Sequence, residues 1–388
     1  MKNIRFLILF FYTLPALGHW EEINSTTNND LIKIEIIDEN AFCGGKNGIL
    51  LKSIDFGNSW TEIATSASGS ITDIHFLNTS VGYFTTSNGK IFKTINEGTI
   101  WTEQSVHNGS INGIDFKDDS TGIAVGDFGN IFKTEDGGEN WINLGSQSIY
   151  ILNDVSFLND TLIVAVGATG SYLFSTNSGE NWTYKNTNQP ETFFTIEKKD
   201  SEIGSIVGTN GSYAEFSEHN LSIGDISIID NDGNWLKDVH FTHKENSYIK
   251  TIVVGFKSTV YIENNGWNNW SMDSLNNLNS VHFFNDTIGL ACGSNGKIYK
   301  TTSGGVPSSI KQIKKIKLNA YPNPVNTTLF FEGNFIDYEA TIYNTLGQLI
   351  LKKVLTENQL DLSHIPKGNY YVKLHSSTNF TIGVFSKK

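Results

Sequence analysis

The sequence predicts an all-β protein, a seven-bladed β-propeller followed by a small C-terminal β-sandwich. Three observations carry this prediction. A unit of about 40 residues recurs along most of the chain, each copy has the pattern of four short strands, and both ends of the array are incomplete in complementary ways. Four strands in about 40 residues is the length of one propeller blade.

A tryptophan after a glycine-containing turn marks each copy of the unit. A copy opens with an alternating strand such as Ile111–Phe116, a second strand runs into a Gly-x-x-Gly turn, and a third ends in the hairpin before the tryptophan, which we expect to begin the fourth. Alternating strands bounded by Asn, Asp and Gly are typical of hairpins. The marker recurs, mostly 40 or 41 residues apart, at Trp20, Trp60, Trp101, Trp141, Trp182, Trp235 and Trp270.

The two ends of the array predict how the ring closes. The last copy, residues 278–305, stops after its third strand, while an orphan Trp20–Ile23 resembles Trp60–Ile63. We expect the N-terminal strand to complete the last blade, which also removes the exposed edges of an open array. The fifth and sixth copies, 193–235 and 236–270, are irregular. Ligand-facing elaboration and simple drift of the repeat both explain this, and drift is the favoured interpretation.

The N-terminal segment predicts secretion. Residues 1–18 contain Lys2 and Arg5, an apolar run over 6–17 and a small-x-small Ala16-Leu17-Gly18, the pattern of a signal peptide, so the mature chain would start near His19. The run is too short to span a bilayer, and no later stretch approaches the required length. We expect the propeller over 19–305, a linker over 306–317 and a second domain over 318–388.

The charge distribution argues against two classes of partner. Arg5 is the only arginine, and residues 19–388 contain 26 Lys against 40 acidic residues. Residues 19–305 have 16 Lys against 35 acids, and the remainder has 10 against 5. The acidic body argues against nucleic acid and anionic membranes as partners. The change of sign marks a domain boundary.

The two cysteines, Cys43 and Cys292, lie in the first and last repeats, which a closed ring brings side by side. A ring-closing disulfide and two buried free thiols are both possible. Equivalent points on neighbouring blades lie farther apart than the roughly 7 Å limit for a disulfide. Two buried thiols are therefore favoured.

The repeat resembles two known propeller families. Ser53–Trp60 has the Ser/Thr-x-Asp-x-Gly-x-x-Trp pattern of the Asp-box of sialidase-like propellers. The whole unit more closely resembles the family named for a photosystem II assembly factor. The resemblance implies the fold and no activity, because a side chain capping a turn and a Trp packed between blades explain the motif. Sialidases bind the substrate carboxylate through an arginine triad, which a mature chain without arginine excludes.

The tail resembles a secretion signal. Tyr321–Val325, Ala340–Gly347 and Ile365–Lys373 are similar, in order, to the motifs of the type A C-terminal sorting domain of the type IX secretion system of Bacteroidetes. The resemblance implies a small β-sandwich that the type IX machinery recognises at the outer membrane, after passage through the periplasm. It also implies an extracellular or outer-membrane-surface location. An ordinary accessory β-sandwich is the alternative.

The first strands of the copies supply the candidate site. The residue before each strand's last apolar position is polar in every copy, and because the first strand of a blade is innermost, these side chains are expected to face the central channel. Histidine and carboxylate could bind a divalent metal or a small polar ligand, although a water-filled channel with polar walls explains them as well and is favoured. These candidate ligand-binding residues are Glu35, His75, Asp115, Ser156, Glu197, His240 and His282.

The sequence contains no Gly-x-Ser-x-Gly, no reactive Cys–His pair and no phosphate-binding loop. We therefore expect no cofactor and no enzyme, but a binding or scaffold propeller whose ligand is a protein or a glycan. The alternative is an extracellular glycan hydrolase that uses channel carboxylates such as Glu35, Asp115 and Glu197 as acid and base. Two carboxylates about 5 to 9 Å apart in an open cleft with aromatic platforms would favour the hydrolase.

Overall fold

The computed structural model describes residues 20–105, 108–244, 248–263, 267–271, 276–305, 318, 320–333, 335–336, 338–345, 348–375 and 380–388. The chain divides into two compact units, residues 1–308 and 309–388. The expected signal peptide, 1–18, and the expected linker, 306–317, lie outside the described residues.

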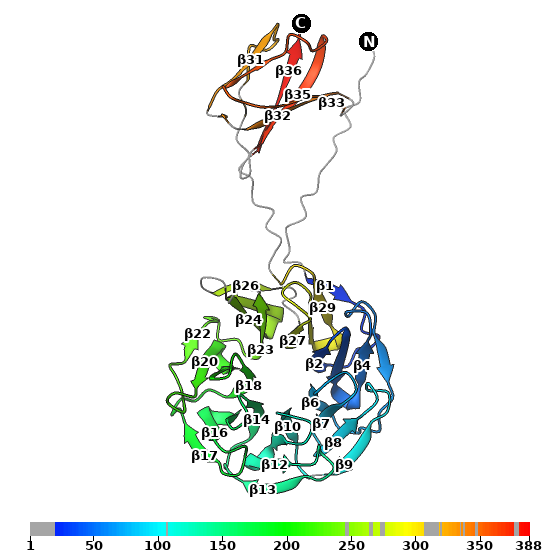
Figure 1. The fold of residues 1–388 in the computed structure, drawn as a ribbon, viewed down its shortest axis with the longest axis vertical. Helices are drawn as coiled ribbons and strands as arrows, with labels where there is room; N and C mark the ends of the chain where they lie inside the picture. The colour runs from blue at the N-terminus through cyan, green and yellow to red at the C-terminus, as the bar shows by residue number, and fades with distance from the viewer. Residues whose placement is uncertain are drawn as a thin grey trace. The chain divides into compact units, whose positions relative to one another are not determined.

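The first unit is a seven-bladed β-propeller, as the sequence predicted (Figure 1). Seven antiparallel sheets surround a central channel. In blades 1 to 4 and 6 the strands pair in the order of the chain from the channel outward. Blade 1 comprises β2 (Leu31–Ile37), β3 (Asn40–Gly45), β4 (Leu50–Ser53) and β5 (Thr61–Ile63). Blade 2 comprises β6 (Ile71–Phe76), β7 (Gly82–Thr86), β8 (Lys90–Thr94) and β9 (Thr102–Ser105).

Blades 3 to 5 continue the ring. Blade 3 comprises β10 (Ile111–Phe116), β11 (Gly122–Gly126), β12 (Asn130–Thr134) and β13 (Ile142–Ser146). Blade 4 comprises β14 (Leu152–Phe157), β15 (Ile163–Gly167), β16 (Ser171–Ser175) and β17 (Thr183–Asn186). Blade 5 comprises β18 (Phe193–Lys198), β19 (Ile203–Gly208), β20 (Ser212–Ser217) and the short β21 (Ser222–Ile223) and β22 (Ser227–Ile228), which both pair with β20.

Blades 6 and 7 complete the ring. Blade 6 comprises β23 (Leu236–Lys244), β24 (Tyr248–Gly255), β25 (Thr259–Glu263) and β26 (Trp267–Ser271). Blade 7 comprises β27 (Leu278–Phe283), β28 (Gly289–Gly293), β29 (Ile298–Thr301) and the N-terminal β1 (Trp20–Ile23). Short 3-10 turns join the second and third strands of six blades: η1 (Lys46–Gly48), η2 (Asp127–Gly129), η3 (Ala168–Gly170), η4 (Thr209–Gly211), η5 (Phe256–Ser258) and η6 (Ser294–Gly296).

The ring closes through the N-terminal strand, which confirms the prediction from the incomplete ends. Trp20 lies opposite Thr301 in the β1–β29 ladder. The Trp20 ring packs edge-on against Phe283 with the centroids 5.9 Å apart. It also covers Gly305, where an added Cβ would come within 3.2 Å of the indole. Trp20 therefore serves blade 7 as the tryptophans of the regular blades serve theirs.

The Asp-box turns are structural, as their capping pattern implied. Asp55 accepts the backbone N–H of Ser59 at 2.9 Å, and Ser53 Oγ accepts that of Gly57 at 2.9 Å. The hydrogen bonds from Ser59 and Ser53 lower the pKa of Asp55 to about 2. The same pair of backbone contacts recurs with Thr94 and Asn96, Thr134 and Asp136, and Ser175 and Asn177.

The expected tryptophan register is wrong in blades 5 and 6. Trp235 does not begin a fourth strand of blade 5: it immediately precedes β23, the innermost strand of blade 6. In blade 6 the fourth strand begins at Trp267, and Trp270 is its fourth residue. The reason is the extra chain between β20 and β23, which forms β21 and β22, so that the spacing of tryptophans no longer measures one blade.

The core lies between neighbouring blades. Cys43 and Cys292 are buried free thiols in one cluster with Leu31 and Leu290, at the junction of blades 1 and 7. Burial, together with the hydrogen bond to Cys292, raises the pKa of the Cys43 thiol well above its usual value. The favoured expectation of two buried thiols is confirmed.

The second unit is a β-sandwich, as predicted. One sheet has the order β30 (Ala320–Tyr321), β31 (Thr328–Phe331), β34 (Gln359–Asp361), and the other β33 (Leu349–Val354), β32 (Glu339–Asn344), β35 (Gly368–His375), β36 (Phe380–Lys387). Leu329 from the first sheet and Val372 and Phe385 from the second belong to one buried cluster. Over the described part of the chain, we find no helix with the length and apolar character needed to cross a membrane.

Candidate functional site

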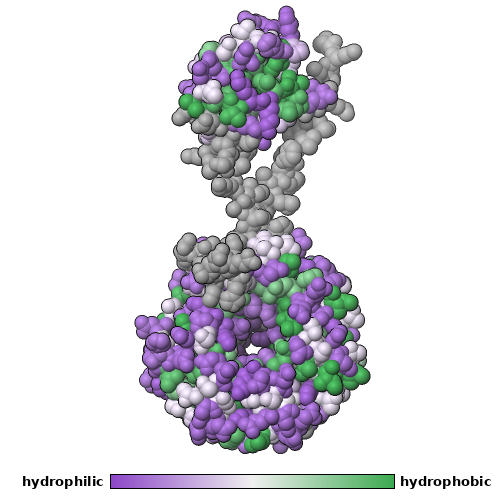
Figure 2. Space-filling view, viewed as in Figure 1, coloured by the Kyte–Doolittle hydropathy of each residue, from purple (hydrophilic) through white to green (hydrophobic). Residues whose placement is uncertain are grey.

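The wall of the channel is made by the innermost strands β2, β6, β10, β14, β18, β23 and β27. Each pairs with a single strand of its own blade, so its other edge carries backbone N–H groups that need acceptors from elsewhere. Side chains of the neighbouring inner strands supply these acceptors. Figure 2 shows the mouth of the channel at the centre of the ring, surrounded mostly by hydrophilic residues.

Four aspartates join the blades in the same way. Each accepts one backbone N–H from its own inner strand and one from the inner strand of the next blade. Asp115 accepts the N–H of Phe116 at 2.8 Å and that of Phe157, in blade 4, at 2.7 Å. The same arrangement is found for Asp73, Asp154 and Asp238. These carboxylates therefore hold neighbouring blades together.

Other side chains take this role at two further junctions. Ser280 Oγ accepts the N–H of Ile34 at 3.2 Å and donates to Asp238 at 2.6 Å. Between blades 5 and 6, the Thr195 hydroxyl donates to the carbonyl of Lys237 at 3.0 Å. Asp73, Asp154 and Asp238 occupy one equivalent position of the inner strands, and Asp115 lies two residues farther along its strand. Lys33, Gly113, Thr195 and Ser280 complete this row. Gly113 is required there because a Cβ would come within 2.8 Å of the Asp154 Cα.

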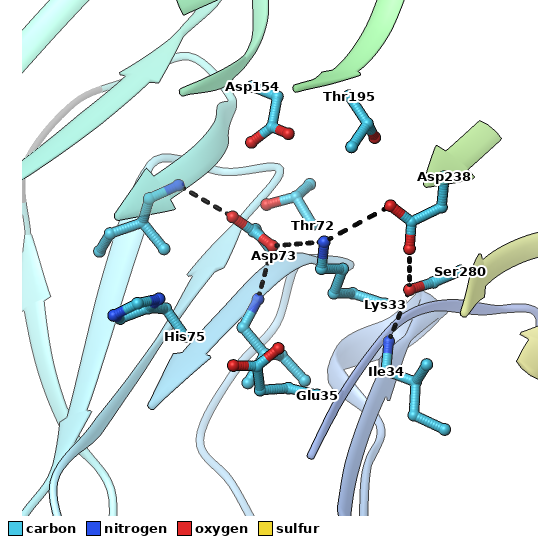
Figure 3. Close-up of polar contacts among 12 residues, drawn as sticks. Lys33, Ile34, Glu35, Thr72, Asp73, His75, Asp154, Thr195, Asp238 and Ser280 are labelled. Atoms are coloured by element: carbon cyan, nitrogen blue, oxygen red, sulfur yellow. Dashed lines mark hydrogen bonds and ion pairs between the residues drawn. The ribbon is translucent and has the colours of Figure 1, made fainter. Parts of the chain in front are cut away.

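Lys33 crosses this row of side chains. Its Nζ lies 3.7 Å from Asp73 and 3.9 Å from Asp238, as Figure 3 shows. Burial alone would lower the pKa of Lys33, but the carboxylates of Asp238 and Asp73 outweigh it and raise this pKa well above its ordinary value. Burial raises the pKa of Asp73 to about 6 even though Lys33 and two N–H groups favour its charged form.

Two cavities of the channel share Lys33, Asp73, Asp154 and Asp238 in their walls. The first chamber, of about 340 Å³, extends toward the ends of the inner strands, and the second, of about 320 Å³, toward their starts. The structure brings all seven candidate residues together in the first chamber: Glu35, His75, Asp115, Ser156, Glu197, His240 and His282.

The imidazoles of the first chamber lie beside its carboxylates. His282 Nδ1 lies 3.1 Å from Glu35 Oε2. Burial would raise the pKa of Glu35, but the charge and hydrogen bond of His282 lower it. The rings of His240 and His282 lie 4.2 Å apart, and His75 Nδ1 lies 3.4 Å from Asp115. Blades 6, 7 and 1 thus place His240, His282 and Glu35 side by side in the chamber wall.

Glu197 differs from the other candidate carboxylates. Its side chain is 39% exposed, and it lies 3.8 Å from His240 Nδ1. Glu197 faces the chamber, where other carboxylates surround it. Burial raises the pKa of Glu197 well above its usual value, and repulsion from Asp238 and Glu35 adds to this effect. The charge of Lys33 opposes it. Among the described residues, no three His, Cys, Asp or Glu side chains are arranged to hold a metal ion.

Sequence reasoning missed the inner-strand position that comes one residue before that of Asp73, Asp154 and Asp238. Thr72, Asn112, Asn153 and Asn279 each donate a side-chain hydrogen bond to a backbone carbonyl of the next blade, at 2.5 to 2.9 Å. The same row has Ile32 in blade 1, Phe194 in blade 5 and Lys237 in blade 6, and all seven residues line the second chamber. A signal for this row is present in the sequence, because the position is Thr or Asn in four copies and departs from these types in three.

The structure thus defines a seven-bladed propeller with a divided polar channel, joined in sequence to a small β-sandwich. Residues 18–148 match the model of the family described as photosynthesis system II assembly factor YCF48, and residues 319–386 match that of the secretion system C-terminal sorting domain. Both matches confirm the resemblances found in the repeat and the tail. The sorting domain directs the protein through type IX secretion to the cell surface or the extracellular space.

Solved structures agree on the fold. The propeller is similar to YCF48 bound to D1 peptide, with a TM-score of 0.61 and 17% identity over 73% of this chain and 97% of that chain. YCF48 from Cyanidioschyzon merolae gives 0.60 and 16% over 73% and 98%. PorZ, a surface component of the type IX secretion system of Porphyromonas gingivalis, gives 0.53 and 12% over 93% and 59%. No curated protein matches the chain.

Proposed function

We propose that the propeller is an extracellular binding module, delivered by its sorting domain, whose ligand is a protein or a glycan. This proposal rests on one observation, that the channel carboxylates hydrogen-bond to neighbouring blades. Asp115 and its counterparts accept inter-blade N–H groups, so the chamber walls are fixed by the same bonds that hold the ring. A preformed concave site loses little freedom when it binds.

The comparisons support a binding role. One similar propeller was solved with a peptide bound, and another is a bacterial surface component of a secretion system. In this chain we assign ligand contact to the first chamber, through Glu35, His75, Asp115, Ser156, Glu197, His240 and His282. Its excess of carboxylates favours a basic or hydroxyl-rich group of the ligand.

The test compares ligand capture by matched variants of the secreted protein. Glu197→Lys places a cation in the first chamber without removing an inter-blade hydrogen bond, and Glu62→Lys makes the same charge change on the exposed outer strand β5. We expect Glu197→Lys to lose capture of the protein or glycan that the wild type retains from extracellular material, and Glu62→Lys to keep it. Equal capture by both variants would show that the first chamber is not the ligand-binding site.

Delivery is tested separately. Deleting residues 318–388 is expected to abolish transfer to the medium and the cell surface and to leave the protein in the periplasm. Unchanged surface delivery of the truncated chain would contradict a sorting role.

One observation favours glycan hydrolysis as a second candidate. Glu197 and Glu35 have pKa values shifted in opposite directions, the pattern of an acid and a base that share a site. Against it, the two residues lie on the non-adjacent blades 5 and 1, and the aromatic residues lining the chamber, Phe116 and Phe157, are buried. Release of reducing sugar from extracellular polysaccharides by the wild type, lost in Glu197→Gln, would establish the hydrolase and displace the binding module.

A further inference from the structure

The seven blades can be compared with one another at the mouth of the second chamber. In every blade, the carbonyl of the residue before the inner strand accepts the N–H that opens the turn between the second and third strands, at 2.8 to 3.0 Å. Only one of the seven pairs has two aromatic side chains, Trp235 and Phe256 of blade 6. The other pairs are Asp30 and Lys46, Ser70 and Ser87, Ser110 and Asp127, Ile151 and Ala168, Thr192 and Thr209, and Asn277 and Ser294.

The inner strands of blades 5 and 6 also depart from the repeat beside Trp235 and Phe256. Blades 2, 3, 4 and 7 have Thr or Asn that bonds to the next blade, and blade 1 has Ile32. The neighbouring blades 5 and 6 have Phe194, which has no side-chain donor, and Lys237. The chain therefore gives up two inter-blade hydrogen bonds at one place. Each such bond is worth about 1 kcal/mol. Residues that arose by drift alone would therefore tend to be lost through selection for stability.

The departing side chains converge on one cluster. The Phe194 and Trp235 rings lie 5.5 Å apart, and Trp235 stacks on Phe256 with centroids at 5.0 Å. The Lys237 Nζ lies 3.7 Å from the centre of the Phe194 ring and 5.2 Å from that of Trp235. Trp235 is 41% exposed, whereas Phe194 and Phe256 are half-buried. We call these four residues the aromatic–lysine cluster.

Lys237 has a cation–π environment and no carboxylate in contact among the described residues. Burial lowers the pKa of Lys237 to about 8. A partly desolvated ammonium that faces only rings would gain from an anionic partner. The cluster borders the second chamber, where Asn153 and Asn279 use Nδ2 for inter-blade bonds and leave Oδ1 to accept from a ligand.

We propose that the aromatic–lysine cluster binds the terminal carboxylated sugar of a glycan. The exposed Trp235 ring suits the apolar C–H face of a sugar, Lys237 supplies the cation for its carboxylate, and the asparagine oxygens accept from its hydroxyls. The propeller has 16 Lys against 35 acidic residues, which disfavours a polyanionic chain and favours a single charged end. This inference rests on the proposed binding function and names the ligand class and a contact site.

The test is a titration of the full chain with oligosaccharides that end in glucuronate, galacturonate or sialate, each paired with its carboxyl-reduced counterpart. We expect at least one acid to bind at pH 7 at least ten-fold more tightly than its reduced partner. Lys237→Met should abolish this preference and leave the neutral sugar's affinity unchanged. Trp235→Ala should weaken both at least ten-fold. The preference should also fade as the pH rises above 8, because Lys237 then loses its charge.

Lys257→Met is the matched control, because Lys257 is exposed in the same turn as Phe256. It should leave both affinities unchanged, and thermal unfolding should show that every variant is folded. If no sugar of the panel binds, if acid and reduced forms bind equally, or if an acidic peptide binds in place of the sugars, the inference is wrong. Continued ligand capture that depends on Glu197 would then show that the proposed binding function holds even though this inference is wrong.

Discussion

Blades 2 to 4 and blades 5 to 6 derive from one repeat but use it differently. In blades 2 to 4 the inner-strand side chains are engaged with the next blade: Asp73, Asp115 and Asp154 accept its N–H groups, and Asn112 and Asn153 donate to its carbonyls. Blades 5 and 6 keep inter-blade bonds through Thr195 and Asp238. At the channel mouth, however, Phe194, Trp235 and Lys237 contact one another.

The difference shows what comparison of the repeats within one chain can reveal. A position that keeps its residue type around the ring is held by the architecture, since each blade needs the same bond. A position that departs at the cost of such a bond is the better candidate for a ligand contact. Substitutions in the two regions test this distinction.

Among substitutions in the inner strands, the largest effect is expected from Asp154→Ala in blade 4. It leaves the N–H groups of Val155 and Ile196 without their acceptor inside the ring, at a cost of about 2 to 4 kcal/mol of unfolding free energy. Asp225→Ala, in the exposed stretch between β21 and β22 of blade 5, should change stability by less than about 0.5 kcal/mol. Chemical denaturation measures both, and similar losses would refute the distinction.

A pH effect of intermediate size is expected from Asp73 in blade 2. Its pKa is raised from 3.8 to about 6 in the folded protein, so the folded state binds more protons than the unfolded state between these values. The stability from this group is present below about pH 4 and is lost as the pH rises to 6, by on the order of 3 kcal/mol. The unfolding free energy of Asp73→Asn, relative to wild type, should rise by that amount over this range. A difference that stays constant with pH would exclude this account.

The smallest effect is expected from the asparagine row. Asn153→Ala removes the 2.7 Å hydrogen bond to the Phe193 carbonyl and should cost about 1 kcal/mol. Phe194→Asn gives blade 5 the residue type of blades 3, 4 and 7, so a new inter-blade bond should offset the lost aromatic contact and keep the change below about 1 kcal/mol. Melting temperatures would separate the two, and a larger loss in Phe194→Asn would mean that the aromatic ring is structural.

Much of this architecture could be predicted from the sequence because it follows from local, repeated signals. The turn glycines, the alternating strands and the complementary ends gave the number of blades and the pairing of Trp20 with the last blade. The alternation also placed Glu35, Glu197 and the three candidate histidines in one chamber. Where the spacing was not regular, as at Trp235 and Trp270, the same reasoning failed.

Other features could not be derived, because they depend on contacts between blades. Nothing in a single copy indicates that Asp115 is used by the N–H of Phe157, or that Lys33 reaches both Asp73 and Asp238. The contacts of Trp235 with Phe194 and Phe256 depend on the packing of blade 5 against blade 6. Such contacts arise only when the ring is assembled.

The central claim is that the repeat tryptophans of the regular blades hold the ring, whereas Trp235, which departs from their register, is available to a ligand. Trp101 of blade 2 is 9% exposed, packs on Phe76 and donates from Nε1 to the Gly98 carbonyl at 3.0 Å, whereas Trp235 is 41% exposed. The most direct measurement is the unfolding free energy of Trp101→Ala beside that of Trp235→Ala. We predict a loss of about 3 to 5 kcal/mol for the first and less than about 1 kcal/mol for the second; equal losses would contradict the claim.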